Sequence, residues 1–301
     1  MVYSLSGGIK TILWIDSFQF IIYLIGGMVI VFSILISDKF VGIESLLIAN
    51  KINIFRFGTE NMFKDAWFFT SAFIGGTLLS FASHGTDHMM VQRALSCKDL
   101  YNAKKAMIGS GLFVIFQFVI FLFVGSLIWI FFSGAEIEKD RELTTYIVNH
   151  LPSGLRGILL AGVLSAAMST LSSSINSLSS STLADWFGKN SDLKFAKKIS
   201  LFWAIVLIGI ALIFDLENTS IVELGLTIAS YTYGGLLGLF ILLNSNRSFN
   251  SLSIVLGLSI SMLSVFYFSF LGVAWTWFIG MSVIVNISSV YFLEKFIFLK
   301  K

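Results

Sequence analysis

The chain has 301 residues, of which 56% are hydrophobic and only 12% are charged. Because soluble domains carry about 25% charged residues, this chain could not cover a globular surface with polar groups, and we expect an integral membrane protein. The net charge of +3 is too small to indicate a nucleic-acid partner, and the single cysteine, Cys97, excludes an internal disulfide and a cysteine metal cluster.

Long intervals without charge predict an all-α, polytopic bundle of transmembrane helices, since a helix needs about 20 mostly apolar residues to cross the hydrocarbon core. No alternation with a period of two, which would indicate a β-barrel, is present. The interval Ser248–Leu293 is too long for one helix, so we divide it near Gly272 into two. Eight spans result: Ser17–Ser37, Ala66–Thr86, Ala106–Ala135, Gly157–Ala184, Ile199–Phe214 (with a start expected one turn earlier), Leu224–Leu243 and the last pair.

The distribution of basic residues among the loops predicts that both termini lie in the cytoplasm. In that orientation thirteen Lys and Arg residues are inside and seven outside, as the positive-inside rule requires. The outside segment Asp38–Asp65 is too charged to span and is expected along the membrane interface. No internal linker or low-complexity tract interrupts the chain, so we expect one membrane domain over residues 1–301, in the plasma (inner) membrane.

The segment Ser165–Thr182, "SAAMSTLSSSINSLSSST", contains eleven Ser or Thr residues. Apolar residues recur among them at helical spacing, which favours a membrane helix over a serine-rich linker. For most of these hydroxyls, close helix packing is the simpler interpretation. Ala166, Ser169 and Thr170, however, stand at i, i+3 and i+4 on one face and could offer a carbonyl and two hydroxyl oxygens to a hard cation such as Na⁺.

The segments "YSLSGGIKTILWIDSFQF", "HGTDHMMVQRALSCKDLYNAKKA" and "GLRGILLAGVLSAAMSTLSSSINSLSSSTLADWF" follow one another in this order along the chain. They resemble three segments of the sodium:solute symporter family, which has a LeuT-like inverted-repeat fold. The first resembles its Tyr-x-x-x-Gly-Gly…Trp-x-Asp-x-x-Gln segment, the second its segment with a Gln-Arg pair and a Lys/Ala-rich connector, and the third its signature segment. The resemblance covers roughly residues 3–187.

The resemblance implies coupled uptake of Na⁺ with a small polar solute such as a sugar, polyol or amino acid. By position, the carbonyl of Ala166 and the hydroxyls of Ser169 and Thr170 would be ligands of the sodium site. Asp16 would lie beneath that site, towards the cytoplasm, as a candidate for ion exit. The alternative for Asp16 is an interfacial ion pair with Lys10 or with a basic loop.

Other polar residues are candidates for contact with the solute. Ser80, Ser83, His84 and Thr86 fall on the helix that lines the substrate site in this family, and Ser230, Tyr231 and Thr232 could face the same cavity. Packing around Gly234, Gly235 and Gly238 is an equally good interpretation of the second group. An H-x-x-D-H metal site (His84, Asp87, His88) is too short to be favoured, and we expect Asp87, His88, Gln92 and Arg93 to stabilise the helix end.

The resemblance also implies that the chain corresponds to the second half of the LeuT-like fold, without the family's first five helices. We therefore expect these residues to transport only together with the missing N-terminal half. A transporter-like sensor domain of a signalling protein is the alternative function. An enzyme is not expected, because G-x-S-x-G, H-E-x-x-H and paired intramembrane aspartates are missing.

Overall fold

The computed structural model describes residues 2–53, 55–58, 61–135, 137, 140–188, 192–213 and 220–298, except for the side chains of residues 2–13, 169, 297 and 298. The described residues form helices joined by loops, with no β-strand among them. The chain divides into two compact units, residues 1–52 with 93–217 and residues 53–92 with 218–301. The all-α class expected from the composition is confirmed, whereas the single membrane domain stays a prediction.

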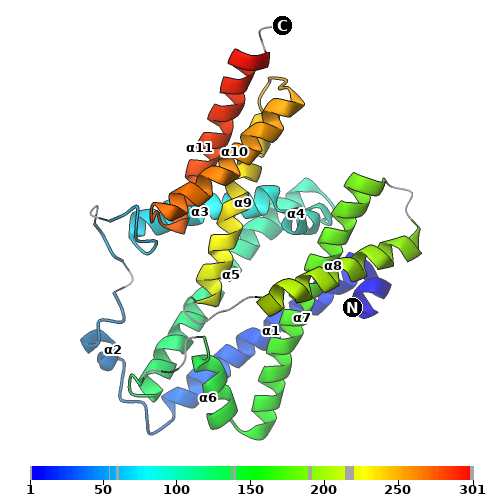
Figure 1. Cartoon of the computed structure of the whole chain (residues 1–301). Helices are drawn as coiled ribbons and strands as arrows, with labels where there is room; N and C mark the ends of the chain where they lie inside the picture. The colour runs from blue at the N-terminus through cyan, green and yellow to red at the C-terminus, as the bar shows by residue number, and fades with distance from the viewer. Residues whose placement is uncertain are drawn as a thin grey trace. The chain divides into compact units, whose positions relative to one another are not determined.

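The first unit is built on three long helices, α1 (Val2–Leu35), α5 (Leu100–Phe131) and α7 (Ser153–Thr182). Helix α1 packs against both α5 and α7 (Figure 1). After α7 a π-helical turn (Leu183–Phe187) precedes α8 (Leu193–Ile213), which returns along α7. Two short helices, α2 (Glu44–Ile48) and α6 (Glu142–His150), pack against α5.

The core of the first unit lies where the ends of α1 and α5 meet α6. Ile34 and Leu127 are fully buried there, and so is Tyr146 of α6. The Tyr146 hydroxyl donates a hydrogen bond to Ser33 Oγ at 3.0 Å, so that burying this large aromatic ring leaves no unsatisfied donor. This contact fixes α6 against α1 and closes one end of the three-helix group.

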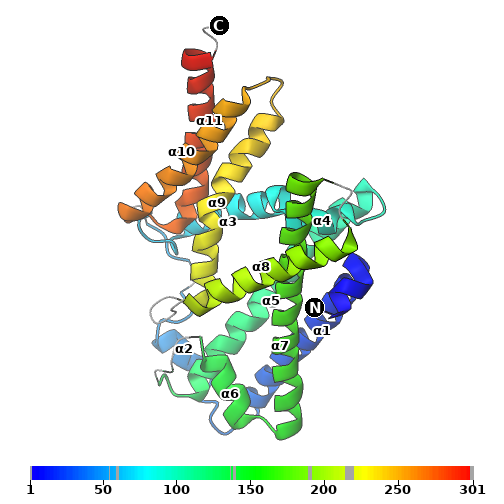
Figure 2. The same cartoon turned by 45° about the vertical axis from the view of Figure 1, so that its right-hand side comes forward.

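The second unit contains α3 (Phe69–Thr86), α9 (Ile221–Leu243), α10 (Ser251–Phe270), a 3₁₀ turn (Trp275–Trp277), α11 (Phe278–Leu293) and a π-helical turn (Glu294–Phe298). Helices α9, α10 and α11 lie side by side (Figure 2). The division between the two units falls within helix α4 (His88–Leu95): its residues up to 92 belong to the second unit and those from 93 to the first.

Glycines let the backbones of α9 and its neighbours approach closely. A Cβ atom at Gly238 would lie 2.9 Å from Cγ of Asn286 in α11, and one at Gly235 would lie 2.6 Å from a methyl group of Leu258 in α10. Ser261 and Asn286 are fully buried here, and Asn286 Nδ2 donates to Ser261 Oγ at 3.3 Å. Small residues and interhelical polar contacts of this kind drive the packing of membrane helices.

Seven of the described helices are long and apolar enough to cross a membrane, against eight expected spans. The difference is Ala66–Thr86: its helix, α3, starts only at Phe69, and its Ser, Thr, Gly and His residues lower its hydropathy. The early start expected for the span Ile199–Phe214 is confirmed, because α8 begins at Leu193. The division near Gly272 is confirmed as well: α10 ends at Phe270, and Gly272 has a φ of +74°, which favours glycine.

The contact between α3 and the 3₁₀ turn gives a test of the second unit. A Cβ atom at Gly75 would lie 2.5 Å from Cβ and 2.6 Å from the carbonyl oxygen of Thr276. Because that backbone oxygen cannot rotate away, we expect Gly75→Ala to lower the free energy of unfolding by about 1–3 kcal/mol, measured as a lower melting temperature in detergent. Gly76→Ala is the matched control, since no atom lies within 4 Å of its added Cβ. Equal melting temperatures for the two variants would contradict this packing.

Candidate functional site

Several hydroxyls of α7 bond within their own helix. Thr170 Oγ1 donates to the carbonyl oxygen of Ala166 at 3.2 Å, and Ser174 Oγ donates to that of Thr170 at 3.0 Å. Ser179 and Thr182 make the same bond, to the carbonyls of Ile175 and Leu178. Since a hydroxyl in lipid must find a partner inside the protein, these bonds explain how a helix so rich in Ser and Thr can cross the membrane.

Helix α7 is joined to α1 by a buried side chain. Gln19 of α1 is 7% exposed. Its Nε2 donates to the carbonyl oxygen of Ser165 at 3.1 Å and to Ser165 Oγ at 2.6 Å. Close packing continues along this seam, because a Cβ atom at Gly162 would lie 2.9 Å from a methyl carbon of Ile22. The start of the serine-rich segment is therefore held in a defined rotation relative to α1.

A cavity of about 580 Å³ opens beside this contact. Its walls come from α1, α5, α7 and Arg93 of α4. The lining residues, which all belong to the first unit, are Asp16, Gln19, Phe20, Tyr23, Arg93, Gln117, Ala166, Ala167 and Thr170. Two of the three predicted sodium ligands, Ala166 and Thr170, thus line the same cavity as the predicted exit residue, Asp16. The side chain of Ser169, the third predicted ligand, lies outside the described part of the structure.

A charged pair lies at this cavity. Arg93 Nη2 of α4 donates to Asp16 Oδ2 of α1 at 2.9 Å, with the Arg93 and Asp16 side chains 35% and 24% exposed. The sequence suggests Lys10 or a basic loop as the ion-pair partner of Asp16. In the structure the partner is Arg93, in the basic segment that follows α3. Partly exposed pairs contribute little to stability, about 1 kcal/mol or less. The pair does, however, place one negative and one positive charge at the wall of a cavity that otherwise offers neutral oxygens.

The chemistry of the cavity suits a monovalent hard cation. The Ala166 carbonyl and the Thr170 hydroxyl lie 3.2 Å apart, and rotation of the hydroxyl proton would let both oxygens face one ion. No group of three or more His, Cys, Asp or Glu side chains that could hold a metal occurs among the described residues. The arrangement therefore offers oxygen ligands with a single nearby carboxylate, which is a weak site for multivalent or transition metals.

The solute candidates of α3 lie in the second unit and bond locally. His84 Nδ1 is 2.9 Å from the Ser80 carbonyl oxygen and 3.0 Å from Ser83 Oγ, and Thr86 Oγ1 donates to the Ala82 carbonyl at 2.7 Å. These residues are partly or fully accessible, so a solute could reach their polar atoms. Their role in solute binding stays a prediction.

The residues after α3 stabilise the helix junction, as expected. Asp87 Oδ1 accepts the backbone N–H of Met89 at 2.8 Å, at the N-terminus of α4, while its Oδ2 accepts the Tyr233 hydroxyl at 2.6 Å. His88 Nε2 lies 2.8 Å from Gln92 Nε2, one turn along α4. Asp87 and His88 are thus engaged in helix capping and intrahelical contacts, which gives no support to an H-x-x-D-H metal site.

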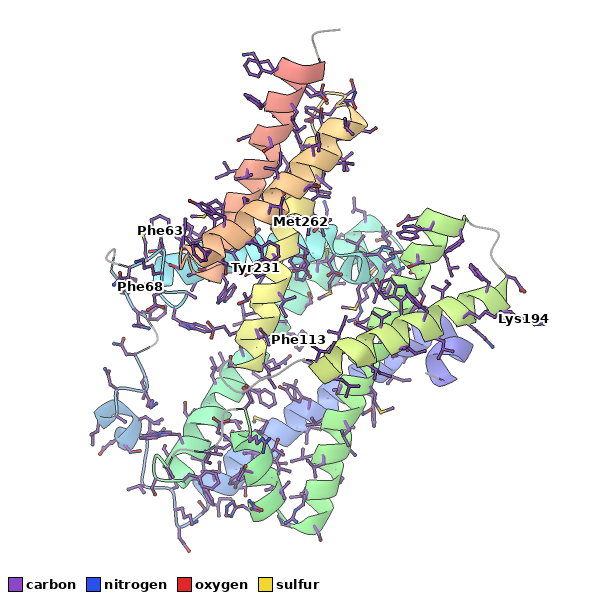
Figure 3. The ribbon with its side chains drawn as sticks, in the orientation of Figure 1. Phe63, Phe68, Phe113, Lys194, Tyr231 and Met262 are labelled. Atoms are coloured by element: carbon purple, nitrogen blue, oxygen red, sulfur yellow. The ribbon has the colours of Figure 1, made fainter. Side chains whose placement is uncertain are left out.

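Of the three candidates on α9, two take part in helix packing. Ser230 is fully buried and donates to the Leu226 carbonyl at 2.7 Å. Tyr231, labelled in Figure 3, donates to Ser269 Oγ of α10 at 2.9 Å. Its ring also packs against aromatic rings of α10 and α11. Thr232 is exposed. This environment favours the packing interpretation for Ser230 and Tyr231 and leaves Thr232 as the accessible member.

Several cavity residues were not among the predicted site residues. Gln19 lies three residues after Asp16, and the resembling segment Trp-x-Asp-x-x-Gln already contained both. Arg93 was expected to stabilise a helix end, and the structure shows it paired with the predicted exit residue, Asp16. Tyr23 and Gln117 gave no signal, because an aromatic and an amide within apolar runs are typical of ordinary membrane helices.

The fold and this cavity together define a polytopic helical membrane protein with an oxygen-lined site beside one carboxylate. The sequence profile of the sodium:solute symporter family matches residues 1–243. The chain belongs to this family, whose members are transporters and not enzymes.

Characterised relatives agree with this assignment. The chain is 26% identical to sodium-coupled monocarboxylate transporter 2 of Bos taurus, over 79% of this chain and 41% of the relative. It is 25% identical to the sodium/sialic acid symporter SiaT of Proteus mirabilis, over 88% of this chain and 57% of the relative. It is 24% identical to the human sodium/iodide cotransporter, over 80% of this chain and 40% of the relative. The chain thus spans about half the length of these relatives, or less.

The α1–α7 contact can be tested directly. Gln19→Ala removes both hydrogen bonds to Ser165 and leaves the partly buried Ser165 oxygens without this donor, so we expect a loss of about 1–3 kcal/mol in the free energy of unfolding. Ser165→Ala removes only the 2.6 Å bond and should cost less. Both are measured as melting temperatures in detergent. Ser110→Ala, an exposed hydroxyl bonded within its own helix, is the control; a Gln19→Ala protein as stable as this control would refute the contact.

Proposed function

We propose that this chain carries half of the sodium site of a Na⁺-coupled symporter for a small polar solute. The observation that carries the proposal is the shared cavity, where the Ala166 carbonyl, the Thr170 hydroxyl and the Asp16 carboxylate occur together. Membership of the family supports Na⁺ as the ion, since the relatives named above are described as sodium-coupled transporters or sodium symporters. Ser169, at the adjacent helical position, would supply the second hydroxyl.

Neutral oxygens suit an ion that must bind and then leave. A carbonyl and hydroxyls replace part of the hydration shell of Na⁺ without the strong attraction of a second or third carboxylate. In this proposal the remaining ligands come from the N-terminal half of the family fold. The chain matches only 40–57% of the lengths of the relatives named above, and in this proposal transport belongs to the two halves together.

The Asp16–Arg93 pair would tune the release of the ion. An approaching Na⁺ competes with the Arg93 guanidinium for the same carboxylate, since the two groups are 2.9 Å apart in this structure. With Arg93 bound to it, Asp16 attracts Na⁺ less. When the pair separates, the carboxylate becomes a second, lower position for the ion on its way out.

The coupling mechanism follows from differential binding. Na⁺ would favour the state in which the solute site is organised, and loading of both would favour closure and inward release. For the solute, the names of the relatives suggest a first screen of monocarboxylates and sialic acid, beside sugars, polyols and amino acids. Ser80, Ser83, His84, Thr86 and Thr232 are the residues we propose for its contacts. By its loop charges the protein would lie in the plasma (inner) membrane with both termini cytoplasmic.

Loss of the hydroxyls tests the sodium site. We expect Ser169→Ala/Thr170→Ala to raise the Na⁺ concentration for half-maximal transport at least about a hundredfold, because each lost contact with a charged group costs about 1.5–3 kcal/mol and this variant loses two. Uptake of radiolabelled solute into proteoliposomes containing both halves of the fold is measured across a Na⁺ series. The control is Ser174→Ala, whose hydroxyl is bonded one turn further along α7. An unchanged Na⁺ dependence in the double variant would refute the assignment of Ser169 and Thr170 as sodium ligands.

The charged pair gives an independent test. We expect Arg93→Gln to raise the apparent affinity for Na⁺ roughly two- to fivefold, since a partly exposed pair contributes about 1 kcal/mol or less, and to slow Na⁺ release. Asp16→Asn should lower the affinity. Lys98→Gln, an exposed charge outside the cavity, controls for the general field. If Arg93→Gln and Asp16→Asn change the affinity for Na⁺ in the same direction, Na⁺ and the Arg93 guanidinium do not compete for Asp16.

A further inference from the structure

A second cavity lies in the second unit, where α9 ends, α10 begins and α11 ends. It has a volume of about 510 Å³ and is lined by residues 246–249 of the α9–α10 loop together with Tyr291, Glu294 and Lys295 at the end of α11. Helix α9 ends at Leu243, α10 starts at Ser251, and the last apolar span ends at Phe296. The cavity therefore lies at the level where hydrocarbon gives way to headgroups.

Two cations face this cavity and are not neutralised by ion pairs in the described part of the chain. The guanidinium of Arg247 lies 5.5 Å from the ring centre of Tyr291, and Lys295 Nζ lies 5.5 Å from that of Phe296. Both side chains are thus laid on aromatic rings with their charged groups accessible.

The single carboxylate of the cavity is already in use. Glu294 Oε1 accepts the backbone N–H of Asn250 at 2.5 Å, and Asn250 Oδ1 accepts that of Leu252 at 2.9 Å at the start of α10. These bonds hold the loop against the end of α11. They also draw the negative charge of Glu294 towards the backbone, so that the pocket keeps a positive side formed by Arg247 and Lys295.

Apolar surface continues outward from the cations. Phe249 packs edge-on against Tyr291, with ring centres 5.3 Å apart, and Phe296 packs on Phe292 at 4.7 Å. Phe292 and Phe296 are 59% and 53% exposed. A ligand that carries a phosphate for the cations and a hydrocarbon tail for this aromatic surface would match both parts of the site.

We propose that this cavity binds the phosphodiester headgroup of an anionic phospholipid. Arg247 and Lys295 contact the phosphate, residues 246 and 248 contact the polar headgroup, and the acyl chains pass over Phe292 and Phe296. Basic pockets at the ends of spanning helices select anionic lipids in this way, and a volume of about 510 Å³ falls within the usual range of small-molecule sites. The bound lipid would tie α9, α10 and α11 together at the membrane surface, independently of the sodium site.

The test compares lipids that differ only in headgroup charge. The protein is purified in detergent, stripped of lipid and titrated with phosphatidylglycerol or phosphatidylcholine of identical chains, and bound lipid is counted by native mass spectrometry. We expect preferential binding of phosphatidylglycerol, weakened about tenfold or more by Arg247→Gln/Lys295→Gln, because each basic residue near the surface contributes about 1 kcal/mol. Lys295→Gln alone, which keeps the Arg247–Tyr291 contact, should show a smaller loss.

Lys197→Gln/Lys198→Gln is the matched control, because it removes two exposed lysines of α8 that line none of the cavities described above. It should change phosphatidylglycerol binding less than twofold. Soluble glycerol 3-phosphate distinguishes a lipid site from a site for free phosphate, and we expect it to compete only weakly. Equal binding of the two lipids, unchanged binding in the Arg247 and Lys295 variants, or full displacement by glycerol 3-phosphate would each overturn the proposal.

Discussion

A polar group that is embedded in lipid must find its partner inside the protein, because an unsatisfied group there costs several kcal/mol. Several hydroxyls of α7 meet this requirement by bonding to carbonyls one turn earlier, from Thr170 to Ala166 and on to Thr182 and Leu178. Once these local bonds exist, the helix can carry many hydroxyls at small cost. Its oxygens are then available to an ion on whichever face a cavity forms.

The position of that cavity depends on how α1 and α7 are fixed to each other. Gln19 of α1 makes two hydrogen bonds to Ser165, and these set the rotation of α7 one residue before Ala166. Asp16, one helical turn before Gln19, then lines the same cavity as Thr170. The same seam thus determines both where the neutral oxygens lie and where the single carboxylate meets them. Arg93 is paired with that carboxylate, and in our proposal it sets how strongly Asp16 attracts a cation.

The sequence predicted the helices well because hydropathy alone determines where a chain can cross a membrane. Each expected span corresponds to a helix of the structure, although α3 is too polar to count as a span. Helix α8 starts six residues before Ile199, as expected, over lysines whose stems can lie along an apolar surface. The predicted sodium ligands came from a motif on a single helix. Partners 77 and 146 residues apart, Asp16 with Arg93 and Gln19 with Ser165, could not be read from any local pattern, because they depend on how the helices pack.

The central claim is that a sodium ion binds against α7, between Ala166 and Thr170. Its most direct test is to locate the ion itself, by determining the structure of the protein joined with the N-terminal half of the fold in thallium(I), a heavier monovalent cation with anomalous scattering. We expect an anomalous peak in contact with the Ala166 carbonyl and the Thr170 hydroxyl, which disappears when excess Na⁺ is added. A peak elsewhere, with these two oxygens still bonded only to each other, would contradict the account.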